Sequence, residues 1–378
     1  MAGPDDLSLA VMTHPARGDR AARLVEALRP LDVTVVPDPR PGDPPGTLRT
    51  SREAWRAAAD GAAYHLVLQD DAVPCRDFGT HLADLLSQDP TGPVALHALW
   101  NTRNGAAIRW GAARGARLIT AVPEFVPCVG LLMPRKAAEG YVAFTERWPD
   151  PATPDDVVMR RYFEAERLRL LLTVPSLVEH GQSRSLMGND HGVYQAACFA
   201  TPPSTGWFRR SDLLIDDFRL LPVVRQGRLW LCSPASPDAH VPWLTEPWEA
   251  ASHQLVRGDE LREEFDAFLD RTDRSTVDTW HRLVGTDVPR TAWTAARLLR
   301  GSRHTGVTDL EPPTSHLVLK ALRTVLTGGF LRIPGPSPIQ RAVLGNLERL
   351  LPLVIDGYGP PGPPAGSERR YRTSGSGP

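Results

Sequence analysis

Lysine is nearly absent from this 378-residue sequence, and cysteine is scarce. Lys136 and Lys320 are the only lysines, so arginine carries almost all of the positive charge. The formal net charge of -1 argues against a protein that binds nucleic acid or a membrane surface. The four cysteines contain no C-x-x-C pair, which is not the pattern of a zinc site or a disulfide framework and fits a reducing cytoplasm.

Targeting and membrane-spanning signals are also missing. The first residues, Met1 to Asp6, lack the basic and apolar regions of a signal peptide. No run of about eighteen apolar residues occurs, so we expect no transmembrane segment. These absences together favour a cytoplasmic protein, and the length suggests two domains.

The chain opens with a pattern that is typical of a βαβ unit. Residues 7–12 predict a strand, the apolar positions within 21–28 predict a helix, and 31–36 predict a second strand. Such a crossover implies parallel strands, so we expect an α/β fold with a mostly parallel sheet flanked by helices.

The loop after the first predicted strand contains Thr13, His14 and Arg17, next to a helix N-terminus where phosphates find donors. It contains neither G-x-G-x-x-G nor G-x-x-x-x-G-K, so it is neither a Rossmann nor a P-loop nucleotide site. Taken alone, the loop is better explained as a solvated, arginine-rich helix start.

Two adjacent aspartates follow the next apolar run. Residues 66–68 predict a buried strand, and Asp70 and Asp71 follow Gln69 at its carboxyl end, where open α/β sheets bind ligands. Adjacent carboxylates repel one another, and a divalent cation carrying a nucleotide diphosphate would relieve that repulsion. An exposed acidic turn would leave the same pattern, and the dipeptide alone does not separate the two interpretations.

A second acidic pair, Asp155 and Asp156, precedes a helix predicted over 157–166. Acidic residues are favoured near a helix N-terminus, where Thr153 could cap and Pro154 could occupy the first position. Helix capping therefore explains the presence of this acidic pair as well as a catalytic role would.

A histidine, His180, precedes a glycine in a polar loop after a strand predicted over 168–174. A lone loop histidine is more often a surface residue than a ligand.

Arg52 lies in the first turn of a helix predicted to begin at Thr50, where Thr50 and Glu53 form a capping box.

The order of these pieces resembles that of the GT-A-fold glycosyltransferases, over roughly the first 200 residues. That family combines a nucleotide-binding βαβ unit, a strand ending in a D-x-D or E-D-D metal motif, an acidic helix start and a late loop histidine. The segment at 174–181, Val-Pro-Ser-Leu-Val-Glu-His-Gly, is similar to the P-S-L-V-x-H-x-G piece of many bacterial members. Gln69 departs from the pattern, because many relatives carry an acid there.

The resemblance implies an inverting transfer of a sugar from a nucleotide-diphosphate sugar to an acceptor hydroxyl. Asp71 and His180 would bind Mn²⁺ or Mg²⁺, and Asp70 would share the metal or lie near the ribose. Asp155 or Asp156 would be the general base, with the second preferred by analogy. The nucleotide-sugar pocket would be formed by Thr13, His14, Arg17, Arg52, Gln69 and Asp70.

The implied organisation is a GT-A-like catalytic domain over 1–203, a mainly helical accessory domain over 204–356 and a disordered tail over 357–378. Helical periodicity predominates after residue 248, and the tail is rich in glycine, proline, serine and arginine.

Two alternative functions stay open. A sugar nucleotidyltransferase would normally carry a glycine-rich loop after the first strand, which residues 13–18 lack, and a GT-A-like fold could also serve as a non-catalytic binding or assembly module.

Overall fold

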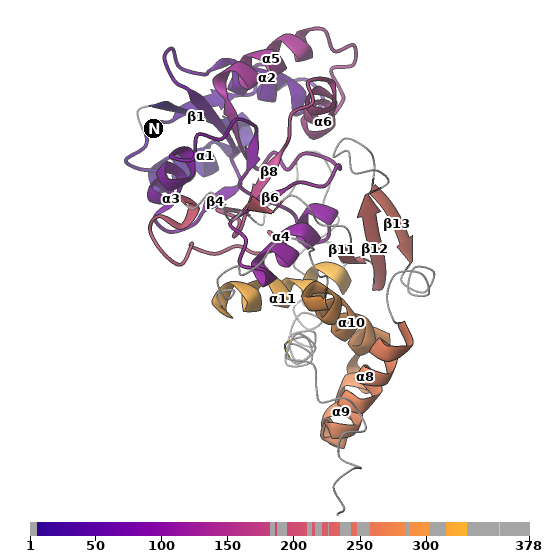
Figure 1. Ribbon diagram of the computed structural model, residues 1–378. Coiled ribbons are helices and arrows are strands. Elements are labelled where there is room, and N and C mark those ends of the chain that lie inside the picture. Colours follow the sequence, from indigo (N-terminus) through magenta and orange to yellow (C-terminus); the bar gives the residue numbers. More distant parts are fainter. Residues whose placement is uncertain are drawn as a thin grey trace, which may run out of the picture.

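A computed structural model describes residues 6–181, 186, 195–209, 214–215, 221–225, 227–234, 243–247, 258–284, 287–301, 315–330 and 355. Its centre is an eight-stranded sheet in the order β10-β6-β8-β5-β7-β3-β1-β2, with helices on both sides (Figure 1). The predicted α/β class with flanking helices is therefore confirmed. The predicted tail over 357–378 lies outside the described residues.

The strands of the central sheet are β1 (Leu7–Thr13), β2 (Thr34–Pro37), β3 (Tyr64–Gln69), β5 (Val94–Ala95), β6 (Leu118–Thr120), β7 (Gly130–Pro134), β8 (Leu171–Thr173) and β10 (Leu214–Ile215). Two small antiparallel sheets accompany it: β4 (Ala72–Pro74) with β9 (Val178–His180), and β11 (Leu221–Arg225) with β12 (Arg228–Pro234) and β13 (Trp243–Pro247).

The helices of the first half are α1 (Gly18–Ala27), α2 (Leu48–Arg56), α3 (Phe78–Leu86), α4 (Arg103–Ala113), α5 (Arg135–Glu146) and α6 (Asp155–Ala165), and a short 3-10 helix, η2 (Pro15–Arg17), precedes α1. Later in the chain come η3 (Trp207–Arg209), α8 (Gly258–Arg271), α9 (Arg274–Val284), α10 (Asp287–Gly301) and α11 (Ser315–Phe330).

The opening βαβ prediction is confirmed. Strand β1 pairs in parallel with β2 and with β3, and its central residues Leu9–Val11 are buried. The second strand begins at Thr34 rather than at residue 31. The sheet as a whole is mixed, because β7 is antiparallel to both of its neighbours, β3 and β5, and β6 is antiparallel to β8.

Two predicted helix starts are wrong, and both lie near the site described below. Helix α2 begins at Leu48, so Thr50 lies inside it and the predicted Thr50–Glu53 capping box does not form. Helix α6 begins at Asp155 with Pro154 preceding it, which puts both aspartates into the first turn. Thr153 does not cap this helix, because its hydroxyl accepts a hydrogen bond from the Trp148 indole and donates one to Asp150.

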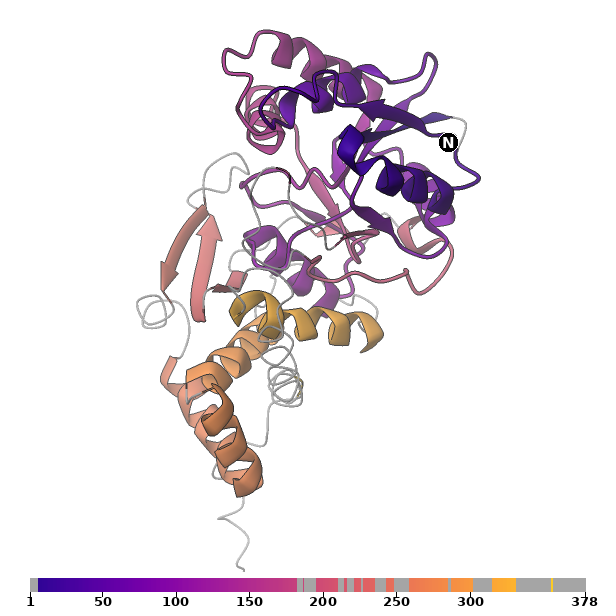
Figure 2. The ribbon, with the colours of Figure 1, turned by 180° about the vertical axis from the view of Figure 1, so that it is seen from behind.

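The later helices pack on the first half through α4 and α11 (Figures 1 and 2). Arg109 of α4 is buried and donates to the Thr324 carbonyl at 2.7 Å and to its hydroxyl at 3.0 Å. At Gly328 a Cβ would lie 2.7 Å from the Trp100 ring, so the close approach of α11 needs a glycine. None of the described helices combines the length and apolar character needed to cross a bilayer.

Candidate functional site

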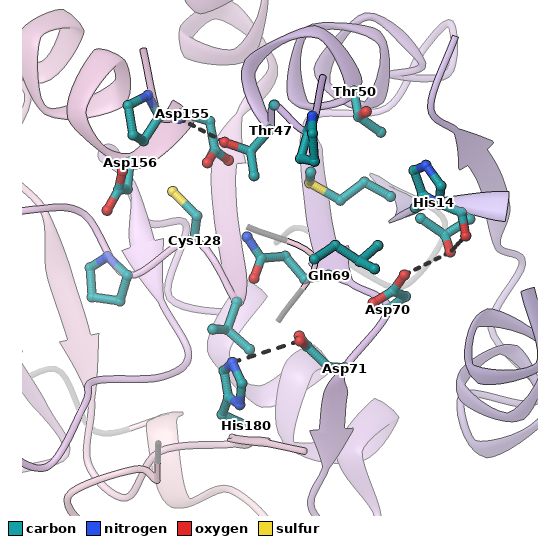
Figure 3. Close-up of a pocket in the computed structure, with 18 of the residues that line it drawn as sticks. His14, Thr47, Thr50, Gln69, Asp70, Asp71, Cys128, Asp155, Asp156 and His180 are labelled. Atoms are coloured by element: carbon teal, nitrogen blue, oxygen red, sulfur yellow. Dashed lines mark hydrogen bonds and ion pairs between the residues drawn. The ribbon is translucent and has the colours of Figure 1, made fainter. Parts of the chain in front are cut away.

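A cavity of about 590 Å³ opens where β1 and β3 end, between those strand ends and the starts of α2 and α6. Figure 3 shows the side chains that face it. Most of the residues predicted for the site line this one cavity. They are Thr13, His14, Arg17, Gln69, Asp70, Asp71, Asp155, Asp156 and His180.

Arg17 pairs with both aspartates that follow β3. Its guanidinium lies 3.0 Å from Oδ1 of Asp70 and 3.3 Å from Oδ2 of Asp71, and the two carboxylates are only 6% and 9% exposed. The Thr13 hydroxyl donates to the other oxygen of Asp70 at 2.7 Å. The mutual repulsion of the aspartates is thus partly relieved by a residue of the chain itself, and both oxygens of Asp70 are engaged.

His180 is brought to Asp71 by the small β4–β9 sheet. Ala72, the residue after Asp71, pairs with His180, and the Gly181 amide donates to the Asp71 carbonyl at 2.6 Å. A Cβ at Gly181 would lie 2.8 Å from that carbonyl oxygen, so a side chain there would push the strands apart. Nε2 of His180 consequently lies 3.7 Å from Oδ2 of Asp71.

The remaining oxygen of Asp71 suits a cation. Oδ1 is buried and has no hydrogen-bond partner, a costly arrangement that a metal ion would relieve. Carboxylate and imidazole together suit Mn²⁺ better than Mg²⁺, which prefers oxygen ligands alone. Within the described ranges no group of three or more His, Cys, Asp or Glu side chains is arranged to hold a metal. Asp71 and His180 would therefore hold it jointly with phosphate or water oxygens.

The second acidic pair forms the other end of the cavity. Asp155 is 4% exposed, and its amide donates to the Thr47 hydroxyl at 3.0 Å, which ties α6 to the start of α2. Burial raises the pKa of Asp155. Burial, followed by the neighbouring charge of Asp155, raises the pKa of Asp156 to about 6. Asp156 is the more exposed of the two and can be reached by a ligand.

Arg52 does not line the cavity. Its Nε donates to the Thr145 hydroxyl at 3.1 Å and its terminal nitrogen donates to the Thr145 carbonyl at 2.6 Å. These bonds join α2 to α5, so the structure gives Arg52 a packing role and does not bring it to the other predicted nucleotide-binding residues.

Asp38 and Thr47 also line the cavity, although they were not predicted as site residues. Asp38 follows β2 and accepts two hydrogen bonds of 2.7 Å from Arg49, which hold the pKa of its carboxyl below the usual value. Its place at the carboxyl end of a parallel strand was a usable signal. Cys128 lies between Asp156 and Gln69 in Figure 3, and burial raises its thiol pKa well above the usual value. No comparable signal marked Thr47, whose role depends on where α2 begins.

We compared the chain with known proteins. No protein-family model matches it, and no curated protein sequence matches it significantly. The function is therefore inferred from the cavity and its residues.

Proposed function

We propose that the protein is a metal-dependent, inverting glycosyltransferase that moves a sugar from a nucleotide-diphosphate sugar to an acceptor hydroxyl. The observation that carries the proposal is the 3.7 Å approach of His180 to Asp71 in a cavity at the carboxyl ends of β1 and β3. Ligands of open α/β sheets bind at such strand ends. The resemblance to GT-A glycosyltransferases requires the same two residues to meet.

The donor would bind at the end of the cavity that contains Arg17. Its guanidinium lies beside the aspartates, where a diphosphate would find a cation able to bind two oxygens, and the Thr13 hydroxyl holds Asp70 in place. His14 is held in the same loop, where its Nδ1 accepts from the Ala16 amide. A divalent cation on Asp71 and His180 would supply Lewis-acid neutralisation of the charge on the leaving diphosphate.

The acceptor would bind at the other end, against Asp156. A carboxylate with a pKa of about 6 is ionised at neutral pH and is also a better proton acceptor than an ordinary aspartate, as a general base requires. Asp156 and Asp71 lie on opposite sides of the cavity, with Cys128 and Gln69 between them (Figure 3). This separation suits a base that faces the leaving group across the sugar, the arrangement that inverts the anomeric carbon.

The residues then have defined parts in the transfer. The acceptor oxygen bonds to the anomeric carbon while its proton passes to Asp156. The bond between that carbon and the diphosphate oxygen breaks, and the nucleoside diphosphate leaves with the electron pair. Arg17 stabilises the negative charge on the departing phosphate.

A thermal-shift experiment tests the proposal. The full chain is heated with UDP, GDP and their sugars, with and without Mn²⁺, and nucleoside diphosphate release is followed in parallel. We expect one nucleotide series to raise the melting temperature only when the metal is present. A non-catalytic module would show the same shift but no release of nucleoside diphosphate with any acceptor tested, and no metal-dependent shift at all would contradict the proposal.

A further inference from the structure

Two carboxyl groups in the first turn of α6 form the acidic end of the cavity. Asp155 and Asp156 are consecutive, and no arginine, lysine or histidine in the described part of the chain forms an ion pair with either. The donor end differs, because Arg17 pairs with both of its aspartates. Buried carboxylates without a positive partner are costly, so this end is suited to a ligand that brings the charge.

A single atom shows where such a ligand would bind. Oδ2 of Asp155 is buried and has no hydrogen-bond partner, although the residue is 4% exposed and lines the cavity. Leaving a buried acceptor unsatisfied destabilises the folded state, and a donor from a ligand would remove that cost. A neutral hydroxyl could donate to Oδ2, but only a cationic donor such as an ammonium group would also bring positive charge to the pair.

Apolar side chains line the same cavity as the acidic pair. Val157 follows Asp156, is 39% exposed and lines the cavity. Phe125 and Pro127 line the same cavity. The lining of the cavity therefore offers a ligand hydrocarbon as well as carboxylates.

We propose that the acceptor carries a primary ammonium group close to its reacting hydroxyl, on a ring or chain with an apolar face. The ammonium group donates to Oδ2 of Asp155, the hydroxyl lies at Asp156, and the apolar face packs on Val157 and Phe125. This inference rests on the proposed function and adds the chemical class of the acceptor. Asp155 acts as a binding and positioning residue, while Asp156 takes the proton.

Matched small molecules test the inference on the full chain without any turnover. The probes are trans-2-aminocyclohexanol and trans-cyclohexane-1,2-diol, which differ only in an ammonium group replacing one hydroxyl, and their dissociation constants are measured by NMR titration at neutral pH. We expect the amino alcohol to bind at least about tenfold more tightly, as one charge-assisted hydrogen bond implies.

Two variants test whether the tighter binding of the amino alcohol depends on Asp155. In Asp155→Asn, which keeps the shape of the side chain, we expect the advantage of the amino alcohol to disappear. Asp278→Asn removes the same charge from an exposed position on α9 and should leave the advantage intact. Equal affinity for both probes, no binding of either probe, or an unchanged preference in Asp155→Asn would overturn the inference. Displacement of the amino alcohol by Mn²⁺ alone would also overturn it, because this end would then be a metal site.

The result of the probe-binding experiment can be distinguished from the result of the glycosyltransferase test. Probe binding needs neither donor nor catalysis, so a protein that transfers no sugar still gives a readable result. Conversely, metal-dependent transfer without any amine preference would refute the acceptor class alone and leave the transferase proposal standing.

Discussion

Nε2 of His180 lies 3.7 Å from Oδ2 of Asp71, although the two residues are far apart in the sequence. Their approach depends on two three-residue strands, β4 and β9, which begin and end at the site. The pair marks one end of a cavity whose other end is formed by Asp155 and Asp156.

Asp71→Asn should remove the metal-dependent stabilisation by nucleotides. The amide keeps the shape of the side chain but binds a divalent cation poorly, and Arg17 still pairs with Asp70 to hold the loop. The measurement is the melting temperature with and without Mn²⁺, in the presence of whichever nucleoside diphosphate stabilises the unaltered protein. Asp77→Asn is the matched control, because Asp77 is exposed and has a left-handed backbone that asparagine tolerates. A variant that keeps the full shift would remove Asp71 from the metal site.

Asp156→Asn should stop transfer while sparing donor binding. Loss of a general base typically lowers kcat by about 10²–10⁴-fold, and the end of the cavity proposed for the donor, at Asp71, lies opposite Asp156. Steady-state kinetics and a donor titration together give the two quantities. Unimpaired kcat in this variant would reject the base assignment.

The rate should fall in acid with an apparent pKa of about 6. Asp156 must be ionised to accept a proton, and its raised pKa means that this form is lost as the pH drops through that value. Because the charge of Asp155 contributes to the shift, Asp155→Asn should move the acid limb to lower pH. A profile of kcat/KM against pH for both proteins measures this. An acid limb that stays in place would show that another group controls the rate.

Arg17→Gln should destabilise the metal-free protein by about 2 kcal/mol, since it leaves two largely buried carboxylates without their shared guanidinium. Saturating Mn²⁺ should recover part of the loss, because the cation would neutralise the Asp71 carboxylate, one of the two that Arg17 pairs with. Urea denaturation with and without the metal measures both effects. Equal free energies of unfolding for the variant and the unaltered protein in the absence of metal would contradict the role given to Arg17.

Arg52→Ala should lower stability without changing nucleotide affinity. The side chain bonds to Thr145 and not to the cavity, so its loss weakens the contact of α2 with α5 by about 1–2 kcal/mol. Urea denaturation and the nucleotide titration test the two halves of this prediction. A marked loss of affinity in a variant that remains folded would return Arg52 to the nucleotide site.

Local patterns in the sequence predict the strands that position the aspartate end of the site. The apolar run before Asp70 predicts β3, and the opening pattern predicts the parallel β1–β2 pair. The general position of Asp71 at a strand end follows from these patterns. They do not predict the β4–β9 pairing, because three-residue strands have no periodicity and their partners are chosen by distant contacts.

Side-chain partners were harder to predict than elements. The sequence shows that Arg17 lies in the loop after β1, but its bridge to both aspartates depends on the packing of that loop against β3. The resemblance implies that Arg52 belongs to the nucleotide pocket, but α2 turns its side chain toward Thr145 instead. That helix also begins before the predicted Thr50–Glu53 box, which shows how weakly a local capping motif fixes a boundary.

The central claim is that Asp71 and His180 share a divalent cation, and electron paramagnetic resonance of bound Mn²⁺ tests it most directly. With a stabilising nucleoside diphosphate present, the account predicts an imidazole nitrogen coupling that disappears in His180→Ala, and a loss of Mn²⁺ affinity of at least about tenfold in Asp71→Asn. A bound Mn²⁺ without nitrogen coupling, or one whose affinity neither substitution alters, would contradict it.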